Sequence, residues 1–175
     1  MYSLSQPKKR YFLLARLLGA FMSAPKAALR LMQKYARKKE KGRADTKVLI
    51  VEDNAANILV VTTMLEHLGY MSDVATCGAE ALQKVLARTA PYMAIFMDVQ
   101  MQDMTGFEAT RQIRELEKDK SFSHFIIGVT AHALVGDRAR CIESGMNDYM
   151  SKPLHLDLLA EKLGLLSTGN KHFSH

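Results

Sequence analysis

The chain contains 175 residues, of which 48% are hydrophobic and 24% are charged, a balance that argues against wholesale disorder. No apolar run reaches the roughly 18–20 residues of a membrane-spanning helix, and two distant cysteines argue against a disulfide scaffold or a cysteine zinc site. The net charge of +6 suggests an anionic partner, but residues 1–44 alone carry 12 of the 24 basic residues and only one acid.

The basic segment, residues 1–44, shows helical periodicity in its second half. An apolar run over residues 11–22 is interrupted by Arg16, and apolar residues recur at helical spacing from Pro25 to about residue 41. Basic residues occupy the other faces of that second stretch, which predicts a basic amphipathic helix. A polar stretch with Gly42 follows, so we expect residues 1–44 to form a basic helical extension and a linker.

Several roles are open for this extension. Its charge is suited to an anionic membrane surface, a nucleic-acid backbone or an acidic partner, and we favour an interaction or membrane-surface helix. A flexible arm and a targeting peptide are the alternatives, although Arg16 interrupts the apolar run that a targeting peptide needs. The sequence has no helix-turn-helix signal, which argues against specific DNA binding.

From residue 47 onward, short apolar runs alternate with longer segments of helical periodicity. The runs predict five strands, over residues 48–51, 70–75, 93–97, 125–129 and 148–151. The longer segments predict five helices, over residues 55–68, 79–88, 106–118, 134–144 and 155–166. Five strand–helix units in succession indicate an α/β domain with a parallel, doubly wound sheet over residues 45–167, followed by a polar tail over residues 168–175. Cys77 and Cys141 are interpreted as small buried residues of this domain.

Polar residues follow the predicted strands at their carboxyl ends, where α/β sheets bind ligands. Glu52 and Asp53 follow the first strand, Asp98 the third, Thr130 the fourth and Lys152 the fifth. Clustered carboxylates repel one another and need a cation, and Mg²⁺ prefers oxygen ligands of this kind. With Asp98 as nucleophile, Lys152 as a cationic contact and Thr130 as a hydroxyl donor, the set is typical of phosphoryl transfer.

Four short stretches carry a family resemblance: KVLIVEDN at 47–54, MDVQMQDMTGFE at 97–108, VTAHA at 129–133 and SGMNDYMSKP at 144–153. Together and in this order they resemble the receiver domain of two-component response regulators, of the chemotaxis-protein-like superfamily. The E-D-N form and the DYMSKP ending look most like receivers of hybrid sensor kinases. The resemblance implies a flavodoxin-like sheet with the strand order 2-1-3-4-5.

The resemblance also implies a role for each reacting group. Asp98 would accept a phosphoryl group from a phosphohistidine on a partner, and Lys152 would contact that group. Asp53 and Asp98 would bind Mg²⁺ directly, and Glu52 would bind it mainly through water. The backbone carbonyl of Gln100 would complete the protein ligands of the metal.

Two further residues are implied to switch, and two depart from the family pattern. Thr130 would move to hydrogen-bond the phosphoryl group, and Tyr149 would follow by changing rotamer. The switch would be read on the fourth helix, fifth strand and fifth helix of the domain. Gln102 stands where a proline is usual, and Thr105 stands where an aspartate commonly precedes the glycine. Both lie in the loop after Asp98, so they bear on the rigidity of that loop.

We expect from the resemblance a single-domain response regulator of a phosphorelay, rather than an enzyme that turns over a substrate. It would act in the cytoplasm, with the basic extension allowing peripheral binding to the inner face of the membrane. Its partners would be a sensor histidine kinase or a histidine phosphotransfer protein, and an output protein of unknown identity. A homodimer also fits the family. About nine residues follow the last predicted helix, so we expect no effector domain there.

Three other functions compete with this one. A phosphorylation-independent pseudo-receiver adaptor is disfavoured because Asp98, Thr130 and Lys152 are all present. A phosphatase of the haloacid-dehalogenase type also uses a strand-end aspartate, but it usually shows a D-x-D motif, and Gln100 occupies the second acidic position. A receiver whose output is membrane or nucleic-acid binding by residues 1–44 is the remaining alternative.

Overall fold

The computed structural model describes residues 47–131 and 135–167, so the extension predicted over residues 1–44 and the tail predicted over residues 168–175 lie outside the described residues. Five parallel strands form one sheet in the order β2-β1-β3-β4-β5, which confirms the predicted doubly wound fold. The strands are β1 Lys47–Val51, β2 Met71–Ala75, β3 Ala94–Asp98, β4 Ile126–Thr130 and β5 Asp148–Ser151. The helices are α3 Ala55–Leu68, α4 Gly78–Leu86, α5 Gly106–Glu117, α6 Val135–Glu143 and α7 Leu156–Ser167.

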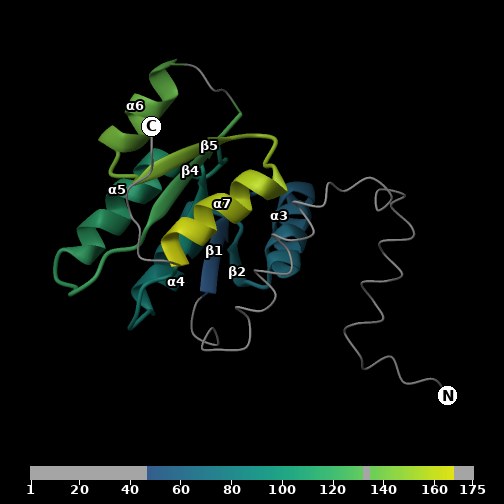
Figure 1. The fold of residues 1–175 in the computed structure, drawn as a ribbon. Coiled ribbons are helices and arrows are strands. Elements are labelled where there is room, and N and C mark those ends of the chain that lie inside the picture. Colours follow the sequence, from purple (N-terminus) through teal and green to yellow (C-terminus); the bar gives the residue numbers. More distant parts are fainter. Residues whose placement is uncertain (1–46, 132–134, 168–175) are drawn as a thin grey trace, which may run out of the picture. The chain divides into compact units, whose positions relative to one another are not determined.

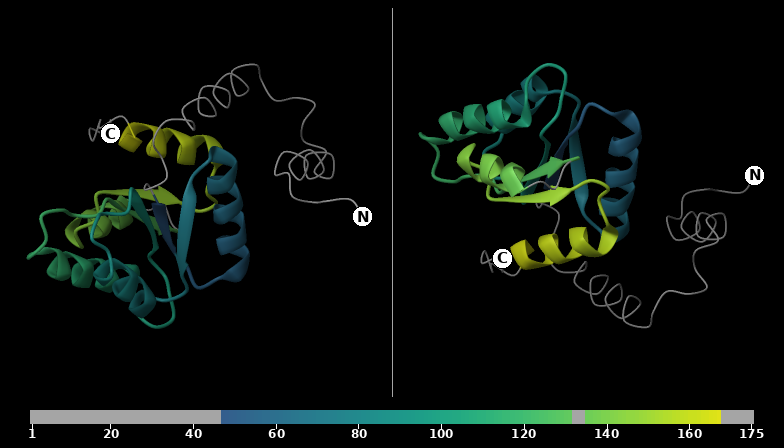
Figure 2. Two further views of the ribbon diagram at one scale, coloured as in Figure 1. Left: turned by 90° about the horizontal axis from the view of Figure 1, so that it is seen from below. Right: turned by 90° about the horizontal axis from the view of Figure 1, so that it is seen from above.

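Helices cover both faces of the sheet. Figure 1 shows α3 and α7 on one face and α4, α5 and α6 on the other, and Figure 2 shows the same two layers from above and below. Alternate residues of β1 enter the two cores: Val48 and Ile50 pack with the α3 and α7 side, and Leu49 and Val51 with the opposite side. The central strands β1, β3 and β4 are therefore apolar except at their ends, where their polar residues lie.

The ends of the helices follow from local chemistry. The Asn54 side chain accepts hydrogen bonds from the backbone N–H groups of residues 56 and 57 and thereby begins α3, and Gly69, with a φ of 83°, ends it in the left-handed region. Thr105 and Glu108 form a reciprocal capping box at the start of α5. In the described part of the chain no helix is both long and apolar enough to cross a membrane.

Two sequence expectations need correction. β3 and β4 each continue one residue further than predicted, so Asp98 and Thr130 are the last residues of their strands. Their backbones still pair, Asp98 with Val129 and Thr130 with Ser151, although their side chains are polar. Cys77 is only partly buried, because it caps α4 and its Sγ accepts a hydrogen bond from the backbone N–H of Glu80, at 3.5 Å.

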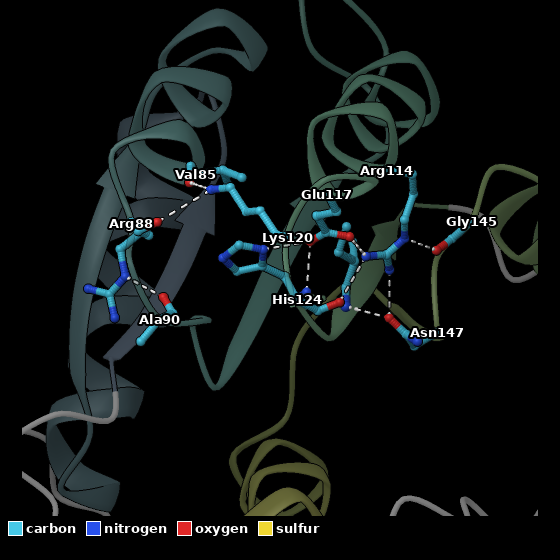
Figure 3. Close-up of polar contacts among 10 residues, drawn as sticks. Val85, Arg88, Ala90, Arg114, Glu117, Lys120, His124, Gly145 and Asn147 are labelled. Carbon is cyan, nitrogen blue, oxygen red and sulfur yellow. Dashed lines mark hydrogen bonds and ion pairs between the residues drawn. The ribbon is translucent and has the colours of Figure 1, made fainter. Parts of the chain in front are cut away.

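A buried polar network joins the amino ends of β4 and β5 to the last turn of α5 (Figure 3). The carboxylate of Glu117 accepts hydrogen bonds from Arg114 Nη1 at 2.6 Å and from the backbone N–H of His124 at 2.7 Å, and it contacts His124 Nδ1 at 2.6 Å. Arg114 also donates to the carbonyl of Gly145 and to Asn147 Oδ1, both at 2.8 Å. Burial acts to raise the pKa of Glu117, but these donors outweigh it and hold that pKa below its ordinary value.

The same region contains a second contact between helix ends. Lys120 Nζ donates to the carbonyls of Val85 and Arg88, at 3.0 and 3.4 Å, where α4 ends (Figure 3). A cation at this position complements the negative end of the helix dipole. Charged groups in and just after α5 thus hold the amino ends of β4 and β5 and the end of α4.

Candidate functional site

Three carboxylates and one lysine meet at the carboxyl ends of β1, β3 and β5. Glu52 and Asp53 directly follow β1, Asp98 ends β3, and Lys152 directly follows β5. One ligand oxygen from each of the three acids lies within 4.8 Å of the other two. The topology produces this cluster, because β1 and β3 are neighbours in the sheet and all the strands point the same way.

Lys152 is the cation of this cluster. Its Nζ donates to Asp98 Oδ2 at 2.7 Å and to Glu52 Oε2 at 2.8 Å. Burial acts to lower the pKa of Lys152, but the hydrogen bonds to Asp98 and Glu52 outweigh it, so the pKa is raised and the ammonium form is favoured. The lysine therefore stays charged beside the two buried carboxylates, where it could also contact a bound anion.

Asp98 is the most enclosed of the three acids, with a side chain that is 5% exposed. Its two oxygens are held separately, since the backbone N–H of Gln100 donates to Oδ1 at 3.1 Å and Lys152 binds Oδ2. Burial, together with the negative charge of Glu52, raises the pKa of Asp98 despite these donors. Gln100 thus contributes its N–H to Asp98 in this structure, in addition to the carbonyl proposed as a metal ligand.

Glu52 is buried and also held at both oxygens. While Oε2 contacts Lys152, Oε1 accepts from Asn57 Nδ2 at 3.0 Å and from the backbone N–H of Asn54 at 3.3 Å. Sequence reasoning missed Asn57. Its position could have indicated the contact. Asn57 lies in the first turn of α3, five residues after Glu52, and from there its side-chain amide reaches back to that acid.

Asp53 is exposed and has a different kind of partner. Its Oδ2 accepts a hydrogen bond from the backbone N–H of Gln102 at 3.2 Å. Gln102 lies in the loop over residues 99–105, between β3 and α5. Sequence reasoning noted Gln102 only as a departure from the usual proline, and did not anticipate its contact with Asp53.

The two predicted switch residues lie on β4 and β5. Thr130 is buried at the end of β4, the strand between β3 and β5, and its hydroxyl lies 3.4 Å from Asp137 Oδ2 on α6. Tyr149 is partly buried on β5 and packs against the core that β3 and α5 share. Thr130 therefore lies in the sheet between the strand that carries Asp98 and the strand that precedes Lys152.

Gly106 positions Asp98 from the other side, because α5 begins against the end of β3. A Cβ at Gly106 would lie 2.2 Å from the carbonyl oxygen of Asp98, whereas a Cβ at Gly78 would meet only the flexible side chain of Met104, at 2.4 Å. Backbone cannot move aside as a side chain can, so we expect Gly106→Ala to lower the free energy of unfolding by about 1–3 kcal/mol and Gly78→Ala to lower it by less. Urea denaturation of both variants measures this, and equal losses would refute the argument.

The donor set of the cluster is suited to a hard divalent cation. All three acids offer oxygen ligands, and the described residues add no thiol or imidazole to the group. Mg²⁺ prefers one or two carboxylates with further oxygen ligands, whereas zinc sites usually include sulfur or nitrogen. Asp53 and Asp98 would hold such an ion, with Glu52 beside them, and Lys152 would contact an anion bound at the same place.

Comparison with known proteins places these observations in a family. The family model of the response regulator receiver domain matches residues 48–164. The hybrid signal transduction histidine kinase L of Dictyostelium discoideum is 43% identical to the chain over 110 residues. That alignment covers 62% of the chain, and the chain spans only 6% of the length of the kinase.

Two solved structures resemble this chain in both fold and sequence. The receiver domain of the sensor histidine kinase PA1611 from Pseudomonas aeruginosa, with a magnesium ion coordinated in its active site cleft, has a TM-score of 0.60 and 38% identity, and the match covers 69% of this chain and 95% of that one. The second is the co-crystal structure of the Saccharomyces cerevisiae histidine phosphotransfer signaling protein Ypd1 and the receiver domain of its downstream response regulator Ssk1. It gives a TM-score of 0.66 and 31% identity, and the match covers 77% of this chain and 97% of that one.

Proposed function

The chain belongs to the response regulator receiver domain family, the phosphoryl-accepting domains of two-component signalling, and we propose that Asp98 is its phosphoacceptor. The observation that carries the proposal is the position of Asp98 at the end of the central strand β3. Its carboxylate is buried, and both oxygens are oriented by donors. A carboxylate held in this way beside a lysine is prepared to attack a phosphorus atom.

The proposed transfer exchanges one bond for another. An oxygen of Asp98 attacks the phosphorus of a phosphohistidine on a partner, a P–O bond forms, and the P–N bond breaks with its electron pair going to the imidazole nitrogen. Lys152 contacts the oxygens of the transferred group, and Thr130 donates its hydroxyl to it. When Mg²⁺ is bound by Asp53, Asp98 and the carbonyl of Gln100, with Glu52 acting through water, it offsets the negative charge of the acids and the phosphoryl group.

The consequence of transfer is a change of surface. We propose that phosphorylation draws Thr130 away from Asp137 and that Tyr149 changes rotamer with it, which alters the surface of α6, β5 and α7. In this proposal the protein is a single-domain switch of a phosphorelay in the cytoplasm. It catalyses only its own phosphorylation and dephosphorylation. Its donor would be a sensor histidine kinase or a histidine phosphotransfer protein, and the Ypd1–Ssk1 complex supports the second kind of donor.

A small phosphodonor tests the proposal without knowledge of the partner. We expect the purified chain to gain one phosphoryl group from acetyl phosphate in the presence of Mg²⁺, and to gain none after EDTA treatment, as measured by intact-protein mass spectrometry. No labelling with Mg²⁺ would favour the pseudo-receiver adaptor. Steady release of phosphate from small phosphomonoesters would favour a phosphatase instead.

A further inference from the structure

The loop over residues 99–105 is attached to the protein at its base and near its tip. At the base, the backbone N–H of Gly106 donates to the carbonyl of Val99, at 3.0 Å. Near the tip, the carboxylate of Asp103 accepts from the backbone N–H groups of Gly78 and Ala79, at 3.2 and 3.3 Å, where α4 begins. The loop therefore has a fixed position between the end of β3 and the start of α4.

Between these two attachments, the loop presents a backbone donor to each of two acids: the N–H of Gln100 to Asp98 and that of Gln102 to Asp53. The N–H of Gln102 donates to Asp53 Oδ2 at 3.2 Å. Asp53 is the exposed member of the cluster, whereas Glu52 and Asp98 are buried and held by Lys152. An exposed carboxylate without such a donor samples several rotamers, only some of which direct an oxygen toward its neighbours.

We propose that the backbone N–H of Gln102, on a loop braced by Asp103, orients Asp53 for binding a divalent cation. The inference rests on the proposed function, since it concerns the Mg²⁺ ligands of that site. The hydrogen bond does not compete with a cation, because an ionised carboxylate has about four lone-pair positions on its two oxygens. Gln102 is thus a positioning residue, and it acts through its main chain alone.

Substitution by proline tests this directly, because proline is the residue that lacks the donor. In the full chain we expect Gln102→Pro to raise the Mg²⁺ dissociation constant about tenfold, the lower end of the usual effect of a lost outer contact to a metal ligand. Gln102→Ala keeps the N–H and is expected to bind Mg²⁺ as the wild type does. Isothermal titration calorimetry with MgCl₂ measures all three proteins.

The acetyl phosphate reaction separates positioning from a general defect. At saturating Mg²⁺ we expect Gln102→Pro to be labelled as fast as the wild type, because the cation then holds Asp53 in place. Asp103→Ala removes the brace but keeps the donor, and we expect weaker Mg²⁺ binding from it also. If Gln102→Pro fails to fold, Asp103→Ala replaces it as the test. Asp103 is exposed, so its substitution should leave the fold intact.

Several outcomes would overturn the inference. Unchanged or tighter Mg²⁺ binding by Gln102→Pro would do so, and so would equal weakening by Gln102→Pro and Gln102→Ala. If only Asp103→Ala can be measured, binding equal to that of the wild type would overturn it. A wild-type chain that binds no Mg²⁺ would instead contradict the proposed function itself, so the two failures are distinguishable.

Discussion

Asp98→Asn is expected to reduce phosphoryl uptake from acetyl phosphate to background, a loss on the order of 10³-fold or more for removal of a nucleophile. An amide oxygen is a poor nucleophile and cannot replace the carboxylate. The substitution is nearly isosteric, and the amide oxygen can still accept from Gln100 or Lys152. The fold should therefore remain while the reaction is lost. Intact-protein mass spectrometry against time, with Mg²⁺ present, measures the effect.

The control for this variant is Asp119→Asn, which removes an exposed aspartate just beyond the end of α5. It should be labelled at the wild-type rate. Full labelling of Asp98→Asn would move the acceptor to another residue, with Asp53 the first to examine because it is exposed. A circular dichroism spectrum equal to that of the wild type would establish that Asp98→Asn is folded.

Glu117→Ala is expected to lower the free energy of unfolding by about 3–5 kcal/mol, the usual result of removing one partner from a buried ion pair. Arg114 and His124 would lose their shared acceptor. The side chain of Glu117 is 5% exposed and that of His124 is fully buried, so water can replace the carboxylate only on the side of Arg114, which is 25% exposed. The last turn of α5 would also lose the hydrogen bonds of Glu117 to the segment that leads into β4, although Arg114 Nη1 would still donate to the carbonyl of His124, at 3.0 Å. Urea denaturation monitored by circular dichroism gives the loss.

A matched control lies two residues away. Glu115 pairs with Lys118 at 2.6 Å, but both side chains are about two-thirds exposed, so Glu115→Ala should cost less than about 1 kcal/mol. Losses of similar size in the two variants would show that the buried network adds nothing specific.

The stabilisation by Glu117 should also depend on pH. Because the folded-state pKa of Glu117 lies below its ordinary value of 4.5, the carboxylate contributes stability that is fully present above pH 4.5. That contribution is lost as the pH falls through the lower, folded-state pKa. The difference in unfolding free energy between the wild type and Glu117→Ala should therefore shrink below pH 4.5, and a constant difference down to pH 3 would contradict this account.

The sequence predicted the elements of the domain well where a single side chain marks a boundary. The helix over residues 55–68 agrees with α3 at both ends, because Asn54 is a strong cap and Gly69 can adopt a positive φ. The strands β3 and β4 were each predicted one residue too early, over 93–97 and 125–129, whereas they end at Asp98 and Thr130. Hydrophobic periodicity ends at the first polar side chain, whereas backbone pairing does not depend on side-chain polarity.

The candidate site was predictable as a set of residue types but not as a set of contacts. Parallel strands place Glu52, Asp98 and Lys152 at one edge of the sheet in any such fold, so their proximity follows from the order of the elements. The donors to Asp53 and Asp103 are backbone N–H groups, which every residue except proline carries. No pattern of side chains indicates which of them will be used.

The charged network of Glu117 was missed for a related reason. Arg114 and Glu117 lie inside the helix predicted over residues 106–118 and His124 just before the strand predicted over residues 125–129, and no sequence motif singles them out. Their burial depends on the path of the chain between α5 and β4, and on Asn147, which lies 33 residues from Arg114. The predicted basic extension over residues 1–44 and its partners stay predictions.

The contact between Gln102 and Asp53 determines which substitutions position 102 can accept without loss of the support to Asp53. Since the main chain supplies the donor, mutation of Gln102 to almost any other residue would leave the support of Asp53 intact. The side chain at position 102 is exposed and can therefore vary without removing the donor to Asp53. Mutation to proline is the one step at this position that would remove the donor and make Asp53 depend on other supports.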